Sequence, residues 1–314
     1  MSPVAPIPSP QEVFREQLRS QLYDALREAG HLFLLLDRQL QDPLAPANEL
    51  PASLPVVHAL GVKDLYDESP DRSPLLLALH WHEPGHLAWL DWSVNLAVAE
   101  WAQSPYRPSL CAWLAAGEGA SAFNQLPDRL EKRLLCRVQS NPAGAPQDAY
   151  LRYFDPRVLP RVLQLLSAAQ RRALLSPTRA WYQMDRDGSL LRHLPLQSAS
   201  DPAIATGLPL CFDAVTTAAL QRIDRLSRLA QTLQDQGDSV LHEFNERLDQ
   251  ALCRAVSLGL TEEADQVAFA SACFRDDDFV KRPDLPRLCR LAAESGLPFD
   301  AVLSQSSAAA LALG

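Results

Sequence analysis

Residues 151–160 read Leu151-Arg152-Tyr153-Phe154-Asp155-Pro156-Arg157-Val158-Leu159-Pro160. The first half of this stretch is β-prone, and apolar residues at helical spacing follow it. Asp155 is suited to accept backbone N–H groups at a helix start, and Pro156 suits the first helical position, where no amide donor is needed. The stretch therefore predicts a strand-to-helix corner in which Asp155 caps the helix.

Charged side chains surround this corner, because Arg152 and Arg157 flank Asp155 within ion-pair reach. A cluster of this kind can be catalytic, but ion-paired corners commonly hold a fold together. We therefore interpret Arg152, Phe154, Asp155, Pro156 and Arg157 as a structural signature. Loss of the cap in Asp155→Ala is expected to cost about 1–2 kcal/mol of stability.

Predicted strands and helices alternate on both sides of the corner. Apolar spacing predicts helices over 13–26, ended by Gly30, and over 92–101, and strands over 32–36, 75–79 and 110–114. A hairpin is expected to pair residues 134–138 with 150–154. This order predicts an α/β fold with a mixed sheet flanked by helices.

The composition changes twice along the chain. Residues 1–10 contain four prolines and are expected to form a disordered lead. The α/β domain is then expected over 11–196. After a polar link, residues 197–314 are expected to form a smaller all-α lobe, with helices near 223–233, 241–255, 262–274 and 284–294.

Four segments, in this order, resemble the type VI secretion adaptor family. The stretch around Asp155 resembles the family signature, and three others flank it: His31–Asp37 as an opening strand ending in Asp, Ser73–Leu79 as a second strand, and Trp181–Gly188 as a hairpin. The resemblance covers roughly residues 28–195, with Ser73 standing where the family more commonly has glycine.

This resemblance implies a non-enzymatic adaptor or chaperone without a cofactor. Such a protein binds a toxic effector and promotes its loading onto the VgrG spike. It also implies that the effector is recognised across the α/β lobe and its junction with a variable helical lobe.

Charge and hydropathy restrict the possible partners. The formal net charge of −9 opposes binding to nucleic acid, whose affinity depends on clustered Lys and Arg. No apolar run reaches the length of about 18 residues needed for a membrane span. The first residues lack the basic and apolar regions of a secretory signal, so a cytoplasmic protein is expected.

Three histidines and a glutamate in residues 80–86 offer a different function. His82-Glu83-Pro84-Gly85-His86 formally matches the zinc-protease pattern, but proline and glycine oppose the helix which that pattern requires. We therefore expect a strand end and a turn here. A zinc-dependent hydrolase using His80, His82 and His86, with Glu83 or Asp91, remains the alternative.

Tryptophans concentrate in the same part of the chain. Trp81, Trp89 and Trp92 are candidate partner-binding residues, because aromatic side chains dominate binding hot spots.

A third possibility is an immunity-type protein, which would bind a toxin and neutralise it without loading it onto the spike.

Overall fold

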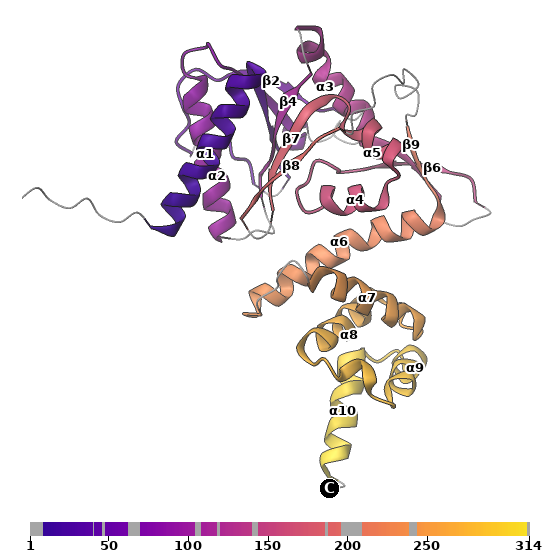
Figure 1. Cartoon of the computed structure of the whole chain (residues 1–314). Coiled ribbons are helices and arrows are strands. Elements are labelled where there is room, and N and C mark those ends of the chain that lie inside the picture. The colour runs from indigo at the N-terminus through magenta and orange to yellow at the C-terminus, as the bar shows by residue number, and fades with distance from the viewer. Residues whose placement is uncertain are drawn as a thin grey trace, which may run out of the picture. The chain divides into compact units, whose positions relative to one another are not determined.

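The computed structural model describes residues 9–39, 41–45, 48–61, 70–103, 108–117, 120–139, 144–185, 188–195, 209–238 and 244–312. The chain divides into two compact units, residues 1–220 and 221–314 (Figure 1). The first unit contains the strands described below, and the second is helical. The predicted fold class is confirmed.

A six-stranded antiparallel sheet organises the first unit. Its order is β2-β3-β1-β4-β7-β8. The strands are β1 (His31–Leu36), β2 (Val56–Ala59), β3 (Leu75–His80), β4 (Leu110–Ala116), β7 (Thr178–Met184) and β8 (Leu190–His193). Every residue of β4, and all but one in β1 and in β3, is buried. These apolar runs are buried on both sides because helices cover both faces of the sheet.

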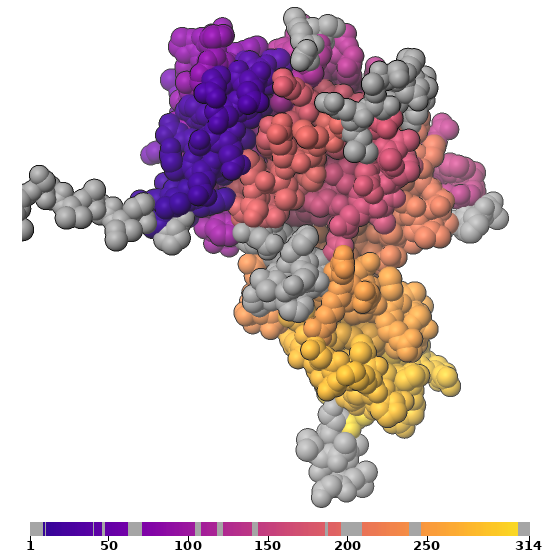
Figure 2. Space-filling model, viewed as in Figure 1, coloured from indigo at the N-terminus to yellow at the C-terminus, as the bar shows by residue number. Residues whose placement is uncertain are grey.

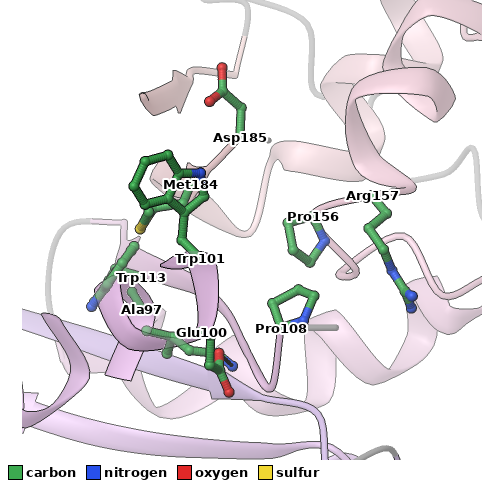
Figure 3. Close-up of a pocket in the computed structure, with 10 residues that line it drawn as sticks. Ala97, Glu100, Trp101, Pro108, Trp113, Pro156, Arg157, Met184 and Asp185 are labelled. Atoms are coloured by element: carbon green, nitrogen blue, oxygen red, sulfur yellow. Dashed lines mark hydrogen bonds between the residues drawn. The ribbon is translucent and has the colours of Figure 1, made fainter. Parts of the chain in front are cut away.

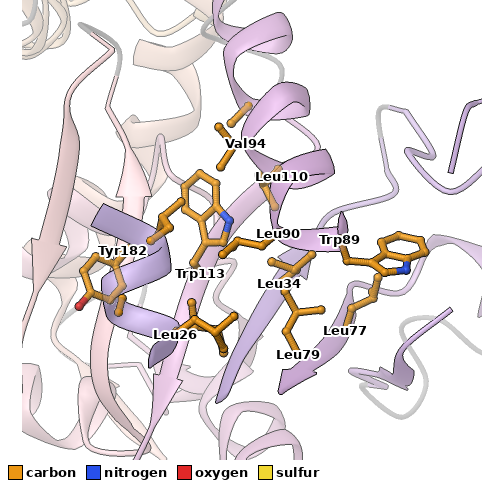
Figure 4. Packing of buried hydrophobic residues seen from close by; sticks show 14 of the residues in the cluster. Leu26, Leu34, Leu77, Leu79, Trp89, Leu90, Val94, Leu110, Trp113 and Tyr182 are labelled. Atoms are coloured by element: carbon orange, nitrogen blue, oxygen red, sulfur yellow. The ribbon is translucent and has the colours of Figure 1, made fainter. Parts of the chain in front are cut away.

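Helices α1 (Pro10–Ala29) and α2 (His86–Gln103) cover one face of the sheet (Figure 1). Figure 4 shows their apolar side chains packed with Leu34, Trp113 and Tyr182 of the sheet. Helix α1 lies at the surface on this side (Figure 2).

The ends of α1 follow the signals in its sequence. Ser9 and Glu12 form a reciprocal capping box at the start, and Gly30 ends the helix with φ of 75°. The predicted disordered lead was therefore wrong for Ser9 and Pro10, because the capped helix already begins there. Residues 1–8 lie outside the described part of the chain.

The other face of the sheet is covered by α3 (Ala120–Leu134), α4 (Leu159–Leu165) and α5 (Ala168–Leu175) (Figure 1). The Phe123 ring of α3 lies 4.7 Å from the ring of Phe33, between ring centroids. Tyr153, just before α4, packs on Trp181 of β7 with a centroid distance of 5.7 Å.

A second, three-stranded sheet lies beside this layer. It consists of β5 (Leu135–Val138), β6 (Gln147–Tyr150) and β9 (Leu210–Phe212), in the order β6-β5-β9. The predicted hairpin exists, but its second strand covers 147–150 instead of 150–154. Strand β9 pairs with β5 in parallel, although its residues were assigned to the helical lobe. The first unit therefore extends past residue 196, because β9 completes its second sheet.

Helix α6 (Ala214–Asp235) runs from the first unit into the second. The second unit continues with α7 (Phe244–Ser257), α8 (Glu263–Arg275), α9 (Leu285–Ser295) and α10 (Phe299–Ala312). Its core contains Phe269, whose ring centroid is 5.7 Å from those of Phe279 and Phe299. Short 3₁₀ turns occur at Pro70–Arg72 and Phe279–Lys281. None of the described helices combines the length and apolar character needed to cross a bilayer.

Candidate functional site

The stretch around Asp155 forms a turn between β6 and α4. Val158 is the N-cap of α4 and makes no side-chain cap bond, and Pro160 occupies the first helical turn. The predicted capping of the helix by the Asp155 side chain, with Pro156 as its first residue, was therefore wrong. Instead, Asp155 Oδ1 accepts the N–H of Arg157 at 2.9 Å, and its carbonyl accepts those of Val158 and Leu159. Asp155 thus stabilises the turn that precedes the helix.

A buried ion-pair network fixes this turn to the sheet. Asp155 and Asp37 are each only 3% exposed. Arg157 Nε donates to Asp155 Oδ1 at 2.8 Å, and the Arg152 guanidinium lies 3.5 Å from Asp155. Arg152 also donates to Asp37 at the end of β1. The network therefore joins the first strand to a turn 115 residues later.

The charges of this network balance one another. Burial by itself raises the pKa of Asp155, but the hydrogen bonds and charge of Arg157, with the charge of Arg152, outweigh it and hold that pKa below its usual value. Phe154 is buried beside it, with the Arg152 guanidinium 5.8 Å from its ring centroid. Two arginines and two carboxylates in this arrangement compensate one another's charge, which a buried ionic network requires.

Two neighbouring groups complete this end of the sheet. The Glu100 carboxylate accepts the N–H groups of Ser109 and Leu110 at 3.0 and 3.2 Å, and burial raises its pKa. Burial, together with Asp37 and Asp155, also raises the pKa of the Cys111 thiol well above its ordinary value. Burial therefore disfavours the thiolate form of Cys111, which is the form that reacts as a nucleophile.

A small pocket opens next to the network (Figure 3). It is lined by residues of α2, β4, β7 and the turn: Ala97, Glu100, Trp101, Pro108, Leu110, Trp113, Pro156, Arg157, Met184 and Asp185. It encloses about 30 Å³, room for a water molecule or two. Organic ligands occupy sites of several hundred Å³, so this pocket does not fit a substrate.

One wall of this pocket depends on a glycine. Gly188, in the turn between β7 and β8, has φ of 81°. A Cβ placed on it would lie 2.8 Å from the Trp101 ring. The turn therefore requires glycine for its backbone conformation and for its close approach to the tryptophan.

The structure places the histidines of residues 80–86 at a strand end and a turn, as expected. His80 ends β3, His82 is exposed in the turn and His86 begins α2. His86 Nδ1 accepts the His80 N–H at 2.9 Å, so this nitrogen is not available to a metal. Burial, chiefly, lowers the pKa of His86.

The further zinc ligand suggested by the sequence has other partners. Asp91 accepts two hydrogen bonds from Arg19, at 2.7 and 3.0 Å, and lies 3.2 Å from the Tyr23 hydroxyl. Within the described ranges, no group of three His, Cys, Asp or Glu side chains is placed to hold a metal ion.

The three candidate tryptophans lie in different environments. Trp89 is fully buried and its Nε1 donates to the Ser53 carbonyl at 3.1 Å, so its prediction as a partner-binding residue was wrong. Trp81 and Trp92 are half-buried, packed edge-on against Tyr23 and Trp89 respectively. Their role in partner binding stays a prediction.

Asp37 is the member of the network that the predicted site residues did not include. Its signal in the sequence was its position after an uninterrupted apolar strand, where a buried carboxylate needs a cationic partner. No protein-family model, curated protein or solved structure matches the chain. The family resemblance consequently depends on the residues quoted above.

Proposed function

We propose that this protein is a non-enzymatic type VI secretion adaptor, which binds a toxic effector in the cytoplasm and promotes its loading onto the VgrG spike. The observation that carries the proposal is the network of Asp37, Arg152, Asp155 and Arg157. The strand end and the turn that resemble the family in sequence are physical partners in the fold. If each segment resembled the family only by chance, there would be no reason for the two segments to form an ion pair with each other in the fold.

The proposed activity needs binding and release, and no covalent step. A partly polar interface of standard size would hold an effector firmly enough for transport and still let it go. Trp81 and Trp92 are the candidate aromatic contacts.

The zinc-hydrolase alternative has less support. The ring nitrogen of His86 is occupied by a backbone N–H, and Asp91 is paired with Arg19. An immunity-type toxin-binding protein shares the binding step with the adaptor, so these two functions differ in their effect on cells and not in the complex they form.

The first test is co-expression of the tagged protein with the products of neighbouring genes, followed by size-exclusion chromatography and measurement of zinc in the same fractions. We expect a stable complex with one toxin-like protein and less than a tenth of an equivalent of zinc. A protein that elutes alone with about one zinc bound would support the hydrolase instead.

Deletion of the gene separates the two binding functions. Loss of an adaptor is expected to abolish effector secretion and leave the cells resistant to their own toxin. Self-intoxication with normal secretion would contradict the proposal and identify an immunity protein.

A further inference from the structure

A second hollow lies on the first unit, away from the Asp155 network. Its volume is about 410 Å³, and it is lined by α4, α5 and the end of β8, through Pro160, Leu163, Gln164, Arg171, Leu175, Arg192, His193 and Leu194. We call it the α4–α5 groove. Four of these side chains are apolar, and Leu194 is 50% exposed. The groove has room for several side chains of a bound peptide.

The stretch of sequence that forms most of the groove differs in charge from the chain as a whole. Residues 156–184 contain five arginines and no Asp or Glu, whereas the whole chain has 38 acidic and 29 basic residues. Arg157 is neutralised by Asp155. Arg171, in the groove, donates to the uncharged carbonyl of Leu166 at 2.9 Å and has no carboxylate partner in the described part of the chain. A cationic site on an acidic protein favours an anionic partner.

Buried polar atoms lie on the same side of the sheet as the groove. Trp181 of β7 is paired directly with His193 of β8, and Gln183 is two residues further along β7, on the same face. The indole N–H of Trp181, both amide atoms of Gln183 and Nε2 of His193 find no hydrogen-bond partner among the described residues. His193 also lines the groove, so a ligand with polar groups could supply its missing partner.

Strand β8 is an edge strand. It follows β7 at the end of the sheet order, and it pairs with no second strand in the ranges the structure describes. Among the described residues, this outer edge offers backbone groups for an added strand, as in proteins that bind extended peptides by β-augmentation.

We infer that the α4–α5 groove binds an extended segment of the effector whose groove-facing side carries both acidic and apolar residues. The apolar side chains would occupy the space between Leu163, Leu175 and Leu194, and the carboxylates would pair with Arg171. The identity of this occupant as effector rests on the proposed function, whereas its chemistry follows from the groove itself.

The test uses the full chain and two fluorescein-labelled eight-residue probes, one repeating Leu-Leu-Glu-Glu and one repeating Leu-Leu-Lys-Lys, so that each face of the extended peptide carries both residue types. Fluorescence anisotropy is measured for the wild type, for Arg171→Glu and for Leu194→Glu. The matched controls are Arg15→Glu on α1, which covers the opposite sheet face, and Leu297→Glu in the second unit, where the side chain is 43% exposed. Thermal unfolding of each variant confirms that it is folded.

We expect the Leu–Glu probe to bind the wild type and the controls, to bind both groove variants at least tenfold more weakly, and to lose affinity as salt is added. The Leu–Lys probe is expected not to bind. Equal binding of the two probes, no binding of either, or unchanged affinity in the groove variants would overturn the inference.

The same variants are then co-expressed with the toxin-like partner. If the wild type retains the toxin and the groove variants retain it equally, the groove inference fails and the proposed function stands. If the Leu–Glu probe binds the groove but no toxin co-purifies, the groove is a peptide site and the proposed function fails.

Discussion

Asp155 is the carboxylate on which the two arginines of the turn converge. Asp155→Ala would leave Arg152 and Arg157 partly buried without their shared counter-charge. Removing one partner of a buried ion pair costs about 3–5 kcal/mol, and the 18–28% exposure of the two arginine side chains places the expected loss near the lower end, about 3 kcal/mol. This exceeds the cost expected for a lost helix cap. Chemical denaturation measures the difference.

The control for Asp155 is Asp148→Ala. Asp148 pairs with Arg137 at the surface, where its side chain is 79% exposed, so a loss of about 0.5 kcal/mol or less is expected. If both variants were equally stable, the network at the turn would have no special importance for the fold.

Gly188 makes a second prediction at this scale. Gly188→Ala combines a positive φ with a Cβ 2.8 Å from the Trp101 ring, whereas Gly30→Ala has a positive φ and open space. The shared backbone strain should cost each variant about 1–2 kcal/mol, and Gly188→Ala should lose clearly more than Gly30→Ala because the tryptophan must move. Equal unfolding free energies in the two variants would show that the contact with Trp101 is unimportant.

At the scale of elements, two histidines are affected by burial, His31 at the start of β1 and His86 at the start of α2. Burial, with the charge of His80, lowers the pKa of His31 and of His86. The Phe123 ring lies 4.7 Å from His31 and 4.8 Å from His80, between centroids. The unfolded chain therefore takes up protons more readily than the folded one at these positions. The free energy of unfolding is therefore unaffected by these two histidines above about pH 6.5. It decreases as the pH falls below that value, because the unfolded chain then binds more protons.

Denaturation at pH 7.5, 6.5 and 5.5 tests this dependence. The double variant His31→Gln/His86→Gln should lose less stability than the wild type between pH 7.5 and 5.5. His82→Gln, at an exposed turn position, is the control and should follow the wild type. A double variant with an unchanged pH profile would contradict the prediction.

The elements that the sequence predicted well are those with local signals. The apolar runs of β1, β3 and β4 and the Gly30 stop of α1 each specify an element without reference to the rest of the chain. The turn at Asp155 was predicted in the wrong form, because its carboxylate takes distant partners that no local pattern reveals. Strand β9 is three residues long, and its Leu-Cys-Phe acquires strand geometry through β5, more than 70 residues earlier.

At the scale of the molecule, the pairing of β9 with β5 determines which fragment of the chain is expected to fold as the first unit. A fragment of residues 9–196 lacks β9 and leaves one edge of β5 unpaired, and it also loses the buried side chains of Leu210 and Phe212. A fragment of residues 9–220 retains them. We expect the longer fragment to be monomeric and to unfold cooperatively, and the shorter one to aggregate.

Size-exclusion chromatography and thermal unfolding compare the two fragments. Phe212→Asp in the full chain is the matched point variant, and it should expose the same edge without truncation. If both fragments were equally well behaved, pairing with β9 would contribute little to the first unit.

The parallel pairing of β5 with β9 also has a consequence during synthesis. Strand β5 leaves the ribosome early, but its partner is separated from it by residues 139–209. At about 5–20 residues per second, translation of that interval takes roughly 4–14 s. For those seconds the nascent chain carries an open strand edge, so slower decoding between the two strands would lengthen its exposure to wrong partners in a crowded cell.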